Sequence, residues 1–267
     1  MNNILEKIIE QKKVELARLD AVELQRAAWQ SPQPRDLISA IKPAKSGLPI
    51  RLIAELKRAS PSKGILAPQI DMFQVAEIYL KNGAAAISVL TDEKFFLGNL
   101  ETLRQLRFTN KFPLPLLRKD FIIDESQLFE SRACGADAVL LIVAALKENA
   151  RLASLHACAI DLGLTALVEV HDETEVERAL RLDGLRLVGI NNRNLSSFDV
   201  SLNTTEQLRP LIPAGVTVVT ESGIFNSNDV DRVTKAKVDA ILVGEALVTA
   251  PDIAAKVREL VGEMVIR

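Results

Sequence analysis

The sequence predicts an α/β fold, a single (β/α)8 TIM barrel with an N-terminal helical extension. Eight apolar runs of strand length alternate with eight runs of helical periodicity, and strict alternation is typical of a parallel sheet. Eight such units fit a chain of 267 residues, and 48% hydrophobic and 25% charged residues suit a soluble globular protein. Five of the predicted strands also end in polar residues, at the end where barrel enzymes have their active sites.

The first part of the chain precedes the alternating units. Hydrophobic residues recur at helical spacing over residues 4–24, with charged residues between them, which predicts one amphipathic helix. Two prolines interrupt the pattern, and a short helix is predicted at residues 36–41. This segment is too short to form a core of its own. We therefore expect residues 1–48 to be an extension and residues 49–267 to form the barrel.

The alternating units follow in order. The predicted strands are the apolar runs at residues 51–57, 84–91, 114–119, 138–143, 165–170, 185–191, 217–221 and 240–243. The predicted helices are the runs at residues 72–81, 100–108, 125–134, 147–162, 173–182, 204–211, 227–235 and 253–264. A doubly wound open sheet is the alternative. It would need a glycine-rich fingerprint after the first strand, and Ser-Pro-Ser-Lys-Gly at residues 60–64 is not one.

The composition argues against several classes of function. The net charge is −2 and no long basic run occurs, so nucleic acid is not an expected partner. We expect a cytoplasmic protein without a membrane span, because no stretch is long and apolar enough and no signal peptide is recognisable. The two histidines and two cysteines show no metal-ligand spacing. The cysteines are expected to be reduced packing residues.

The first strand carries two charges on one face. Alternate side chains of a strand share a face, so Ile53, Glu55 and Lys57 point to the same side. Burying a carboxylate and an ammonium is costly unless they pair or serve a site. Glu55 and Lys57 are therefore either a structural ion pair at a strand end or part of an active site.

Other predicted strands end in the same way. In each of four further strands, a polar residue near the end shares its face with apolar residues earlier in the strand. These polar residues are Lys119, Glu169, Asn191 and Glu221. The carboxyl ends of the strands form the active-site face of this barrel. Together with the charges of the first strand, these residues supply two ammonium groups, three carboxylates and an amide. Such a set suits acid–base chemistry, because neighbouring charges can move pKa values toward neutrality.

A phosphate site is predicted after the last two strands. Gly223 and Gly244 follow these strands, and loops at these positions often bind phosphate through backbone N–H groups. Two ordinary turn glycines are the alternative. The carboxylate of Glu245 would repel a phosphate, so we expect its side chain to point away and only its N–H to contribute.

Five stretches together resemble the signature of one enzyme family. They are residues 54–64, 117–122, 167–171, 189–195 and 220–224. On these motifs the chain is similar to indole-3-glycerol phosphate synthase. The resemblance implies a helical extension over the barrel mouth and a ring closure in tryptophan biosynthesis. It implies the substrate 1-(2-carboxyphenylamino)-1-deoxyribulose 5-phosphate, with indole-3-glycerol phosphate, carbon dioxide and water as products.

The resemblance also implies roles for the strand-end residues. Lys119 matches the general acid at the sugar ketone, and we expect its pKa to lie below the ordinary value of about 10.4. Glu169 matches the residue that protonates the departing hydroxyl, with Lys57 as a rival. Glu55 is a candidate base for the dehydration. Two residues would hold substrate hydroxyls and steady the lysines: Asn191 and Glu221.

The same resemblance implies binding residues and no cofactor or metal, and we infer no obligate protein partner. The candidates for the substrate carboxylate are Arg193 and Lys57. The backbone N–H groups implied for phosphate binding, with Ser60 nearby, are those of Ser222, Gly223, Gly244 and Glu245. The candidates for an apolar wall around the aryl ring are Phe95, Phe121, Leu141, Leu195 and Ile224, for which ordinary packing is an equal alternative. We expect the loop at residues 60–65 to close over the substrate.

From the residues alone, other functions stay open. Lys119 is also suited to form a Schiff base with a sugar phosphate, as in an aldolase. A phosphate-binding barrel with a degenerate site is a second alternative, although the intact set of strand-end residues argues against it. An isomerase of the same fold would bind similar phosphates without needing this lysine-rich set.

Overall fold

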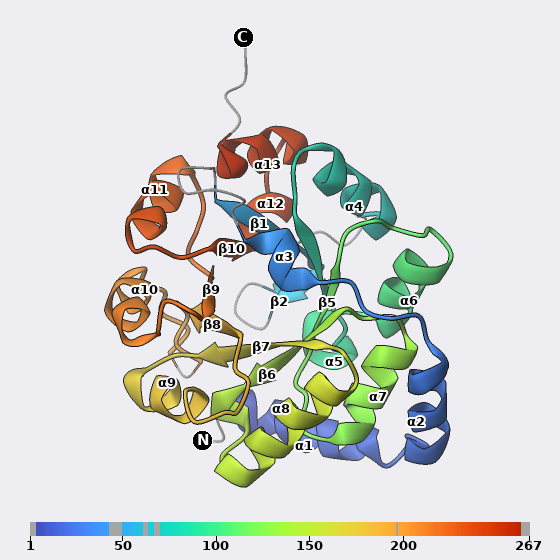
Figure 1. The fold of residues 1–267 in the computed structure, drawn as a ribbon. Coiled ribbons are helices and arrows are strands. Elements are labelled where there is room, and N and C mark those ends of the chain that lie inside the picture. The colour runs from blue at the N-terminus through green and yellow to red at the C-terminus, as the bar shows by residue number, and fades with distance from the viewer. Residues whose placement is uncertain (1–3, 43–49, 61–63, 67–69, 196, 263–267) are drawn as a thin grey trace.

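The predicted barrel is present in the computed structural model, which describes residues 4–42, 50–60, 64–66, 70–195 and 197–262 (Figure 1). Its strands are β1 (Arg51–Leu56), β4 (Ala86–Leu90), β5 (Leu116–Lys119), β6 (Ala138–Ile142), β7 (Thr165–Val170), β8 (Leu187–Asn191), β9 (Thr217–Glu221) and β10 (Ala240–Val243). Neighbouring strands are parallel, and the sheet closes in the order β1-β10-β9-β8-β7-β6-β5-β4. The predicted fold class is confirmed.

Helices surround the barrel. They are α1 (Ile4–Leu16), α2 (Ala21–Gln30), α3 (Leu37–Ile41), α4 (Met72–Lys81), α5 (Glu93–Phe96), α6 (Leu100–Phe108), α7 (Glu125–Ala133), α8 (Asn149–Asp161), α9 (Glu173–Ala179), α10 (Asn203–Leu208), α11 (Ser227–Lys235), α12 (Glu245–Val248) and α13 (Ile253–Val261). Helices α4, α6 and α11 begin and end where predicted. The prediction missed α5, α12, the 3-10 turn η1 (Val143–Ala145), and the antiparallel pair β2 (Ala59–Ser60) and β3 (Gly64–Ile65). The predicted helix at residues 204–211 is divided into α10 and the 3-10 turn η2 (Arg209–Leu211). Such short segments show no periodic pattern.

The prediction of one helix over residues 4–24 is wrong. Helix α1 ends at Leu16, and α2 begins at Ala21 with Asp20 as its N-cap. The Asp20 carboxylate accepts hydrogen bonds from the N–H groups of Val22 and Glu23, at 3.1 and 3.0 Å. Both helices are amphipathic, so the hydrophobic spacing continues across the break, and only the capping aspartate marks it.

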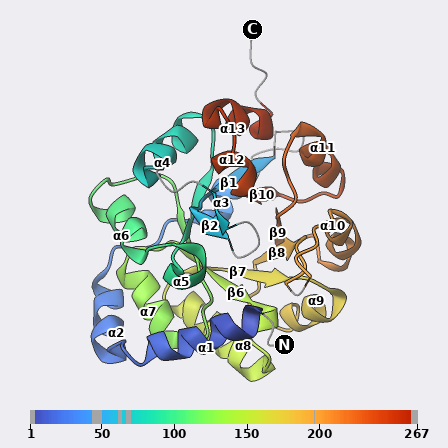
Figure 2. The same cartoon turned by 180° about the vertical axis from the view of Figure 1, so that it is seen from behind.

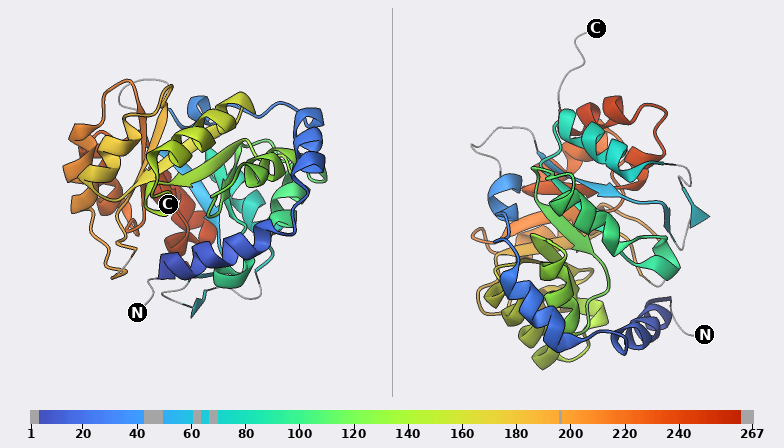
Figure 3. Two further views of the ribbon diagram at one scale, coloured as in Figure 1. Left: turned by 90° about the horizontal axis from the view of Figure 1, so that it is seen from below. Right: turned by 90° about the vertical axis from the view of Figure 1, so that its right-hand side faces the viewer.

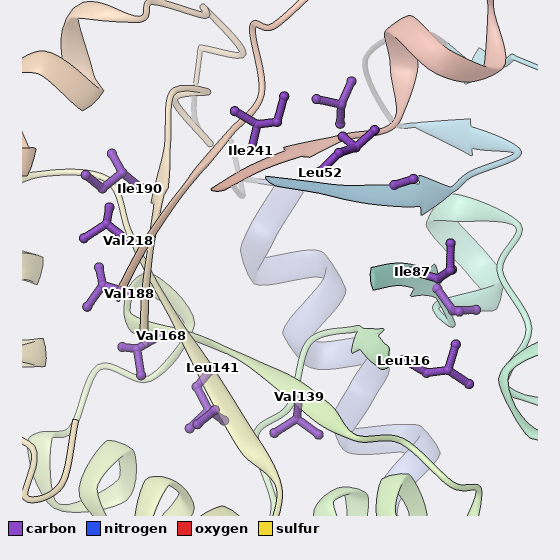
Figure 4. Close-up of a cluster of buried hydrophobic side chains, with 14 of the residues drawn as sticks. Leu52, Ile87, Leu116, Val139, Leu141, Val168, Val188, Ile190, Val218 and Ile241 are labelled. Atoms are coloured by element: carbon purple, nitrogen blue, oxygen red, sulfur yellow. The ribbon is translucent and has the colours of Figure 1, made fainter. Parts of the chain in front are cut away.

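Alternation along the strands divides the core into two apolar layers. One cluster lies between the barrel and the helices and includes Leu52, Ile87 and Val168 (Figure 4). A second cluster fills the barrel and includes Ile53 and Leu167. Both faces of the strands are therefore buried, as is usual for parallel strands covered by helices. Charged side chains at the strand ends are exceptions in these apolar surroundings.

The three N-terminal helices occupy different places around the barrel. Helix α3 lies across one end, where Leu37, Ile38 and Ile41 are buried in the cluster that fills the barrel (Figure 1). Helix α2 packs beside α7 on the outside of the ring. Helix α1 lies at the opposite end from α3 (Figures 2 and 3). The strands finish at the end that α1 covers, so α1 is the N-terminal helix that borders the site.

Both cysteines are free thiols. Burial raises the pKa of Cys134 and of Cys158 to about 11. Within the described ranges, no helix is long and apolar enough to cross a membrane. In the same part of the chain, no three His, Cys, Asp or Glu side chains are grouped as metal ligands.

Candidate active site

A pocket opens at the ends of the barrel strands, beside α1. The predicted site residues that line it are Glu55, Lys57, Lys119, Phe121, Glu169, Asn191, Arg193, Leu195, Glu221, Ser222, Gly223, Ile224, Gly244 and Glu245. Helix α1 contributes Ile4, Leu5 and Ile8 to the same pocket. The structure therefore brings the strand-end residues together, while their individual roles stay predictions.

Lys119 lies between two carboxylates. Its Nζ is 3.2 Å from Oε2 of Glu169 and 3.2 Å from Oε2 of Glu221. These side chains are nearly buried, with exposed fractions of 14% for Lys119, 2% for Glu169 and 3% for Glu221. Lys57 pairs with Glu55, with 3.3 Å between Nζ and Oε1. The ion pair considered for the first strand is therefore present, and it lines the same pocket as Lys119.

The prediction of a lowered pKa for Lys119 is wrong. Burial opposes charging of the ammonium, but attraction by Glu169, Glu221 and Glu55 outweighs burial and raises the pKa of Lys119 above its ordinary range. Ready release of the proton would require a lowered pKa, but β7 and β9 place two carboxylates beside the Lys119 ammonium. Lys119 is therefore protonated at neutral pH in the ligand-free protein.

The two carboxylates beside Lys119 differ in proton affinity. Burial raises the pKa of Glu221 to about 7, because repulsion from Glu169 and Glu55 offsets the attraction of Lys119. Burial also opposes ionisation of Glu169, but Lys119 and His171 outweigh it and hold the pKa of Glu169 below its ordinary range. Neighbouring carboxylates with different environments are a common basis for separate acid and base roles.

Glycines make room for two of the site carboxylates. A Cβ atom at Gly189 would lie 2.3 Å from Oε1 of Glu221, and one at Gly244 would lie 2.5 Å from Oε1 of Glu55. Any larger residue would therefore displace a carboxylate. The sequence predicts phosphate binding for Gly244 and no role for Gly189. In the structure, the absence of a side chain at each glycine leaves room for a carboxylate, that of Glu221 at Gly189 and that of Glu55 at Gly244.

Asn192 is hydrogen-bonded to the end of β9. The sequence did not identify it as a site residue. Its Nδ2 donates hydrogen bonds to Oγ1 of Thr220 and to the carbonyls of Glu221 and Ser222, at 2.9, 3.0 and 3.0 Å. Ser222 has a φ of 66°, in the left-handed region that is costly for residues with a side chain. The Asn192 amide holds the carbonyls of this turn in place. The choice of polar residues at the ends of predicted strands selected only its neighbour Asn191.

The apolar wall of the pocket differs in part from the prediction. Three predicted residues line it: Phe121, Leu195 and Ile224. Leu141 does not, because it points into the cluster between the barrel and the helices (Figure 4). Its neighbours Leu140 and Ile142 line the pocket instead. All five residues of β6 are apolar and buried, so the sequence offers no contrast between the two faces of this strand.

Phe96 takes the place predicted for Phe95. Phe96 lines the pocket, with its ring centroid 5.9 Å from that of Phe121 and 6.0 Å from Nζ of Lys57. Phe95 packs against the cluster that fills the barrel, and Nζ of Lys94 lies 5.8 Å from its ring centroid. Both residues belong to α5, where successive side chains point in different directions.

Arg193 and Glu245 both line the pocket and form an ion pair. Nη2 of Arg193 is 3.5 Å from Oε2 of Glu245. The backbone of Ser60 lies in β2. The predicted lid at residues 60–65 falls partly outside the described residues, at 61–63.

Known proteins resemble this chain over nearly its whole length. A family model described as indole-3-glycerol phosphate synthase matches residues 5–260. Indole-3-glycerol phosphate synthase of Roseiflexus castenholzii is 50% identical over 274 residues, covering 99% of this chain and 100% of the relative. That of Dehalococcoides mccartyi is 48% identical over 263 residues, covering 96% and 99%. The chain belongs to the indole-3-glycerol phosphate synthase family.

The resemblance seen in the five motifs is thereby confirmed. The region that matches the indole-3-glycerol phosphate synthase family includes α1, α2 and α3 as well as the barrel. Membership makes the protein a carboxy-lyase of tryptophan biosynthesis.

Solved structures of lower identity share the fold. The 3-hexulose-6-phosphate synthase of Salmonella typhimurium has a TM-score of 0.62 at 17% identity and covers 80% of this chain and 97% of its own. A thiamine phosphate pyrophosphorylase of Pyrococcus furiosus has a TM-score of 0.53 at 18% identity, covering 79% and 93%. These likenesses concern the barrel, and the indole-3-glycerol phosphate synthase assignment rests on the family and its curated members.

Proposed function

We propose that the protein converts 1-(2-carboxyphenylamino)-1-deoxyribulose 5-phosphate to indole-3-glycerol phosphate, carbon dioxide and water. The observation that carries this proposal is the pocket, where two lysines and three carboxylates lie beside an apolar wall. Such a pocket suits a substrate with an aromatic ring, anionic groups and hydroxyls. We place the activity in the cytoplasm, with this sugar phosphate as ligand and without a nucleic-acid, membrane or obligate protein partner.

Condensation would use Lys119. The ring carbon that bears the carboxylate attacks the sugar ketone, and Lys119 gives a proton to the ketone oxygen as negative charge develops there. Because Glu169 and Glu221 keep the ammonium protonated, Lys119 enters the cycle in the state that an acid requires. The same carboxylates would stabilise the positive charge that the substrate nitrogen acquires during the attack.

The later steps need a second acid and a base. Loss of carbon dioxide restores the aromatic ring, after which the new hydroxyl leaves with a proton and another proton is removed from the five-membered ring. Glu169 is the proposed donor to the hydroxyl, with Lys57 as the alternative, and Glu55 is the proposed base. Because its pKa is lowered in the ligand-free protein, Glu169 would first have to accept a proton during the earlier steps.

The remaining pocket residues would bind the substrate. Phosphate would contact the backbone N–H groups of Ser222, Gly223, Gly244 and Glu245. The aryl ring would lie against the apolar wall, for which Phe96 and Leu140 replace Phe95 and Leu141. Lys57 and Arg193 are the proposed partners of the substrate carboxylate, and Arg193 would then leave its contact with Glu245.

A direct assay tests the function. Folded protein incubated with the carboxyphenylamino-deoxyribulose phosphate should produce the fluorescence of an indole, and mass spectrometry should identify indole-3-glycerol phosphate. The control is the same protein after heat unfolding. Absence of product from protein with a cooperative unfolding transition would refute the proposal.

An aldolase that forms a Schiff base on Lys119 is the alternative from another reaction class. A Schiff base requires a neutral amine, whereas two carboxylates hold Lys119 in its charged form. Treatment with borohydride in the presence of substrate should therefore leave Lys119 unmodified. A reduced adduct on Lys119 in a peptide digest would show the acid role to be wrong.

A further inference from the structure

His171 stands between the site and a second pocket. It directly follows β7, and its side chain is 12% exposed. Glu169 lines the site pocket, whereas His171 and Glu175 line a neighbouring pocket formed with α1 and the start of α9. Neither His171 nor Glu175 has a part in the reaction as proposed above.

Glu175 determines the orientation of the His171 ring. Its Oε2 lies 2.9 Å from Nδ1 of His171 and accepts a hydrogen bond from the backbone N–H of His171 at 2.8 Å. Glu175 is held in the first turn of α9, where Oδ1 of Asp172 accepts a hydrogen bond from its N–H at 2.8 Å. Nδ1 of the ring is therefore turned to α9, and Nε2 to the barrel.

Nε2 of His171 faces the buried carboxylate of Glu169. The distance from Nε2 to Oε1 of Glu169 is 3.3 Å, while Oε2 of Glu169 is 3.2 Å from Nζ of Lys119. The two oxygens of Glu169 thus contact two different cations, and rotation of the carboxylate would break both contacts. Burial disfavours the imidazolium, but Glu169 and Glu175 outweigh it and raise the pKa of His171 to about 10.

We propose that His171 and Glu175 are positioning residues: Glu175 orients the His171 ring, and Nε2 of His171 holds Oε1 of Glu169 so that Oε2 stays directed at Lys119 and the substrate. An imidazolium suits this task because both ring nitrogens carry a proton, so one rigid ring can face a carboxylate on each edge. The proposal rests on the proposed function, since the orientation of Glu169 matters only if Glu169 acts on the substrate.

Two substitutions of His171 separate the roles of its ring nitrogens. In His171→Asn the amide nitrogen replaces Nδ1 and reaches Glu175, whereas in His171→Gln it replaces Nε2 and reaches Glu169. We expect His171→Asn to lower kcat about 10- to 100-fold with KM changed by less than about 3-fold, and His171→Gln to recover most of that loss. Equal losses in the two variants, or no loss in His171→Asn, would overturn the proposal.

The matched control is Glu173→Gln, which removes an exposed charge from the same turn of α9. This variant should keep the kinetics of the unmodified protein. The pH profile gives a readout that a merely structural role would not move. Without the imidazolium the pKa of Glu169 rises, so the limb of kcat/KM that reports Glu169 should move to higher pH in both His171 variants.

A spectroscopic test needs no substrate and so separates this proposal from the function. The chain has two histidines, so His156→Gln assigns the imidazole NMR signals. In the folded protein the His171 signal should titrate well above pH 8, and Glu175→Gln should lower its midpoint by at least one pH unit. A His171 midpoint near the ordinary value of about 6.5 would overturn the proposal. If the unmodified protein forms no indole product while His171 titrates as expected, the proposed function is refuted and the contact between His171 and Glu169 is not.

Discussion

Lys119 is held in its charged form by residues from other strands. Desolvation alone would lower the pKa of the lysine, but two carboxylates lie at 3.2 Å from its Nζ. A buried ammonium with such partners stays charged at neutral pH, and its positive charge offsets the repulsion between the two carboxylates.

Lys119→Ala should abolish turnover while substrate binding survives. Removal of the proposed acid should lower kcat by about 10²- to 10⁴-fold, while the phosphate and aryl contacts stay in place. Steady-state kinetics and calorimetric binding of the product check the two parts. Lys147→Ala, at a side chain that is 82% exposed, is the control and should change neither. A Lys119→Ala variant with near-normal activity would place the acid elsewhere.

Gly189→Ala should displace the Glu221 carboxylate. The added Cβ would lie 2.3 Å from Oε1 of Glu221, so that side chain must move away from Lys119. We expect kcat to fall by about 10²-fold, as for other misplacements of about 1 Å. Gly215→Ala is the matched control, because nothing lies within 4 Å of a Cβ there. If Gly189→Ala and Gly215→Ala had equal kcat, the proposed role of Glu221 would be contradicted.

Among the elements, α1 is attached to the barrel mouth by a buried charge. Lys12 is 3% exposed, and its Nζ lies 2.9 Å from Oδ2 of Asp92 and 2.8 Å from Oδ1 of Asp120. Asp92 is the N-cap of α5, and Asp120 follows Lys119 at the end of β5. Three residues of α1 line the pocket: Ile4, Leu5 and Ile8. The placement of α1 is therefore coupled to the two loops that border the site.

Lys12→Met should loosen α1 and weaken substrate binding. The substitution removes the Lys12 cation from Asp92 and Asp120, of which Asp120 keeps its ion pair with Arg118 at 3.1 Å. Breaking a buried ion pair typically costs about 3–5 kcal/mol in the free energy of unfolding. KM should rise more than kcat falls, because α1 contributes to the pocket wall. Urea denaturation and kinetics measure the two effects. Lys13→Met, at a 59% exposed side chain in the same turn, should behave as the unmodified protein, and equal stability of the two variants would refute the attachment.

At the scale of the whole molecule, ionisation of the buried Glu221 lowers the free energy of unfolding at high pH. Glu221 has a folded pKa of about 7 and an ordinary value of 4.5, so the folded state binds its proton more tightly than the unfolded state. Its contribution to stability is therefore present below about pH 4.5 and is lost as the pH rises through 7. Above that range the folded protein holds an additional buried negative charge.

Glu221→Gln should stabilise the protein at pH 8 more than at pH 5.5. The amide is close in shape to the protonated acid, so little changes at the lower pH, while at pH 8 the buried negative charge is absent. We expect a Tm increase of a few degrees at pH 8, measured by calorimetry, together with a loss of activity. The exposed Glu77→Gln serves as control. A Tm gain that is the same at both pH values would contradict the raised pKa of Glu221.

Several features of the site followed from local patterns in the sequence. The alternation of strands and helices predicted the barrel, and period-two spacing placed Glu55 and Lys57 on one face. Parallel closure then brought the polar ends of the strands to one pocket. Leu141 and Phe95 were assigned wrongly because uniformly apolar strands and single-turn helices carry no local signal of which side faces the site.

The sequence by itself therefore determined the fold, the family and the end of the barrel at which the site lies, since these depend on spacing along the chain. Only the tertiary structure decided which charges are partners. Lys119 with Glu221, Lys12 with Asp120 and His171 with Glu169 lie within 3.3 Å of one another. Coulomb energies and pKa values depend on such distances and on burial, and for residues far apart in the chain only the folded arrangement sets them.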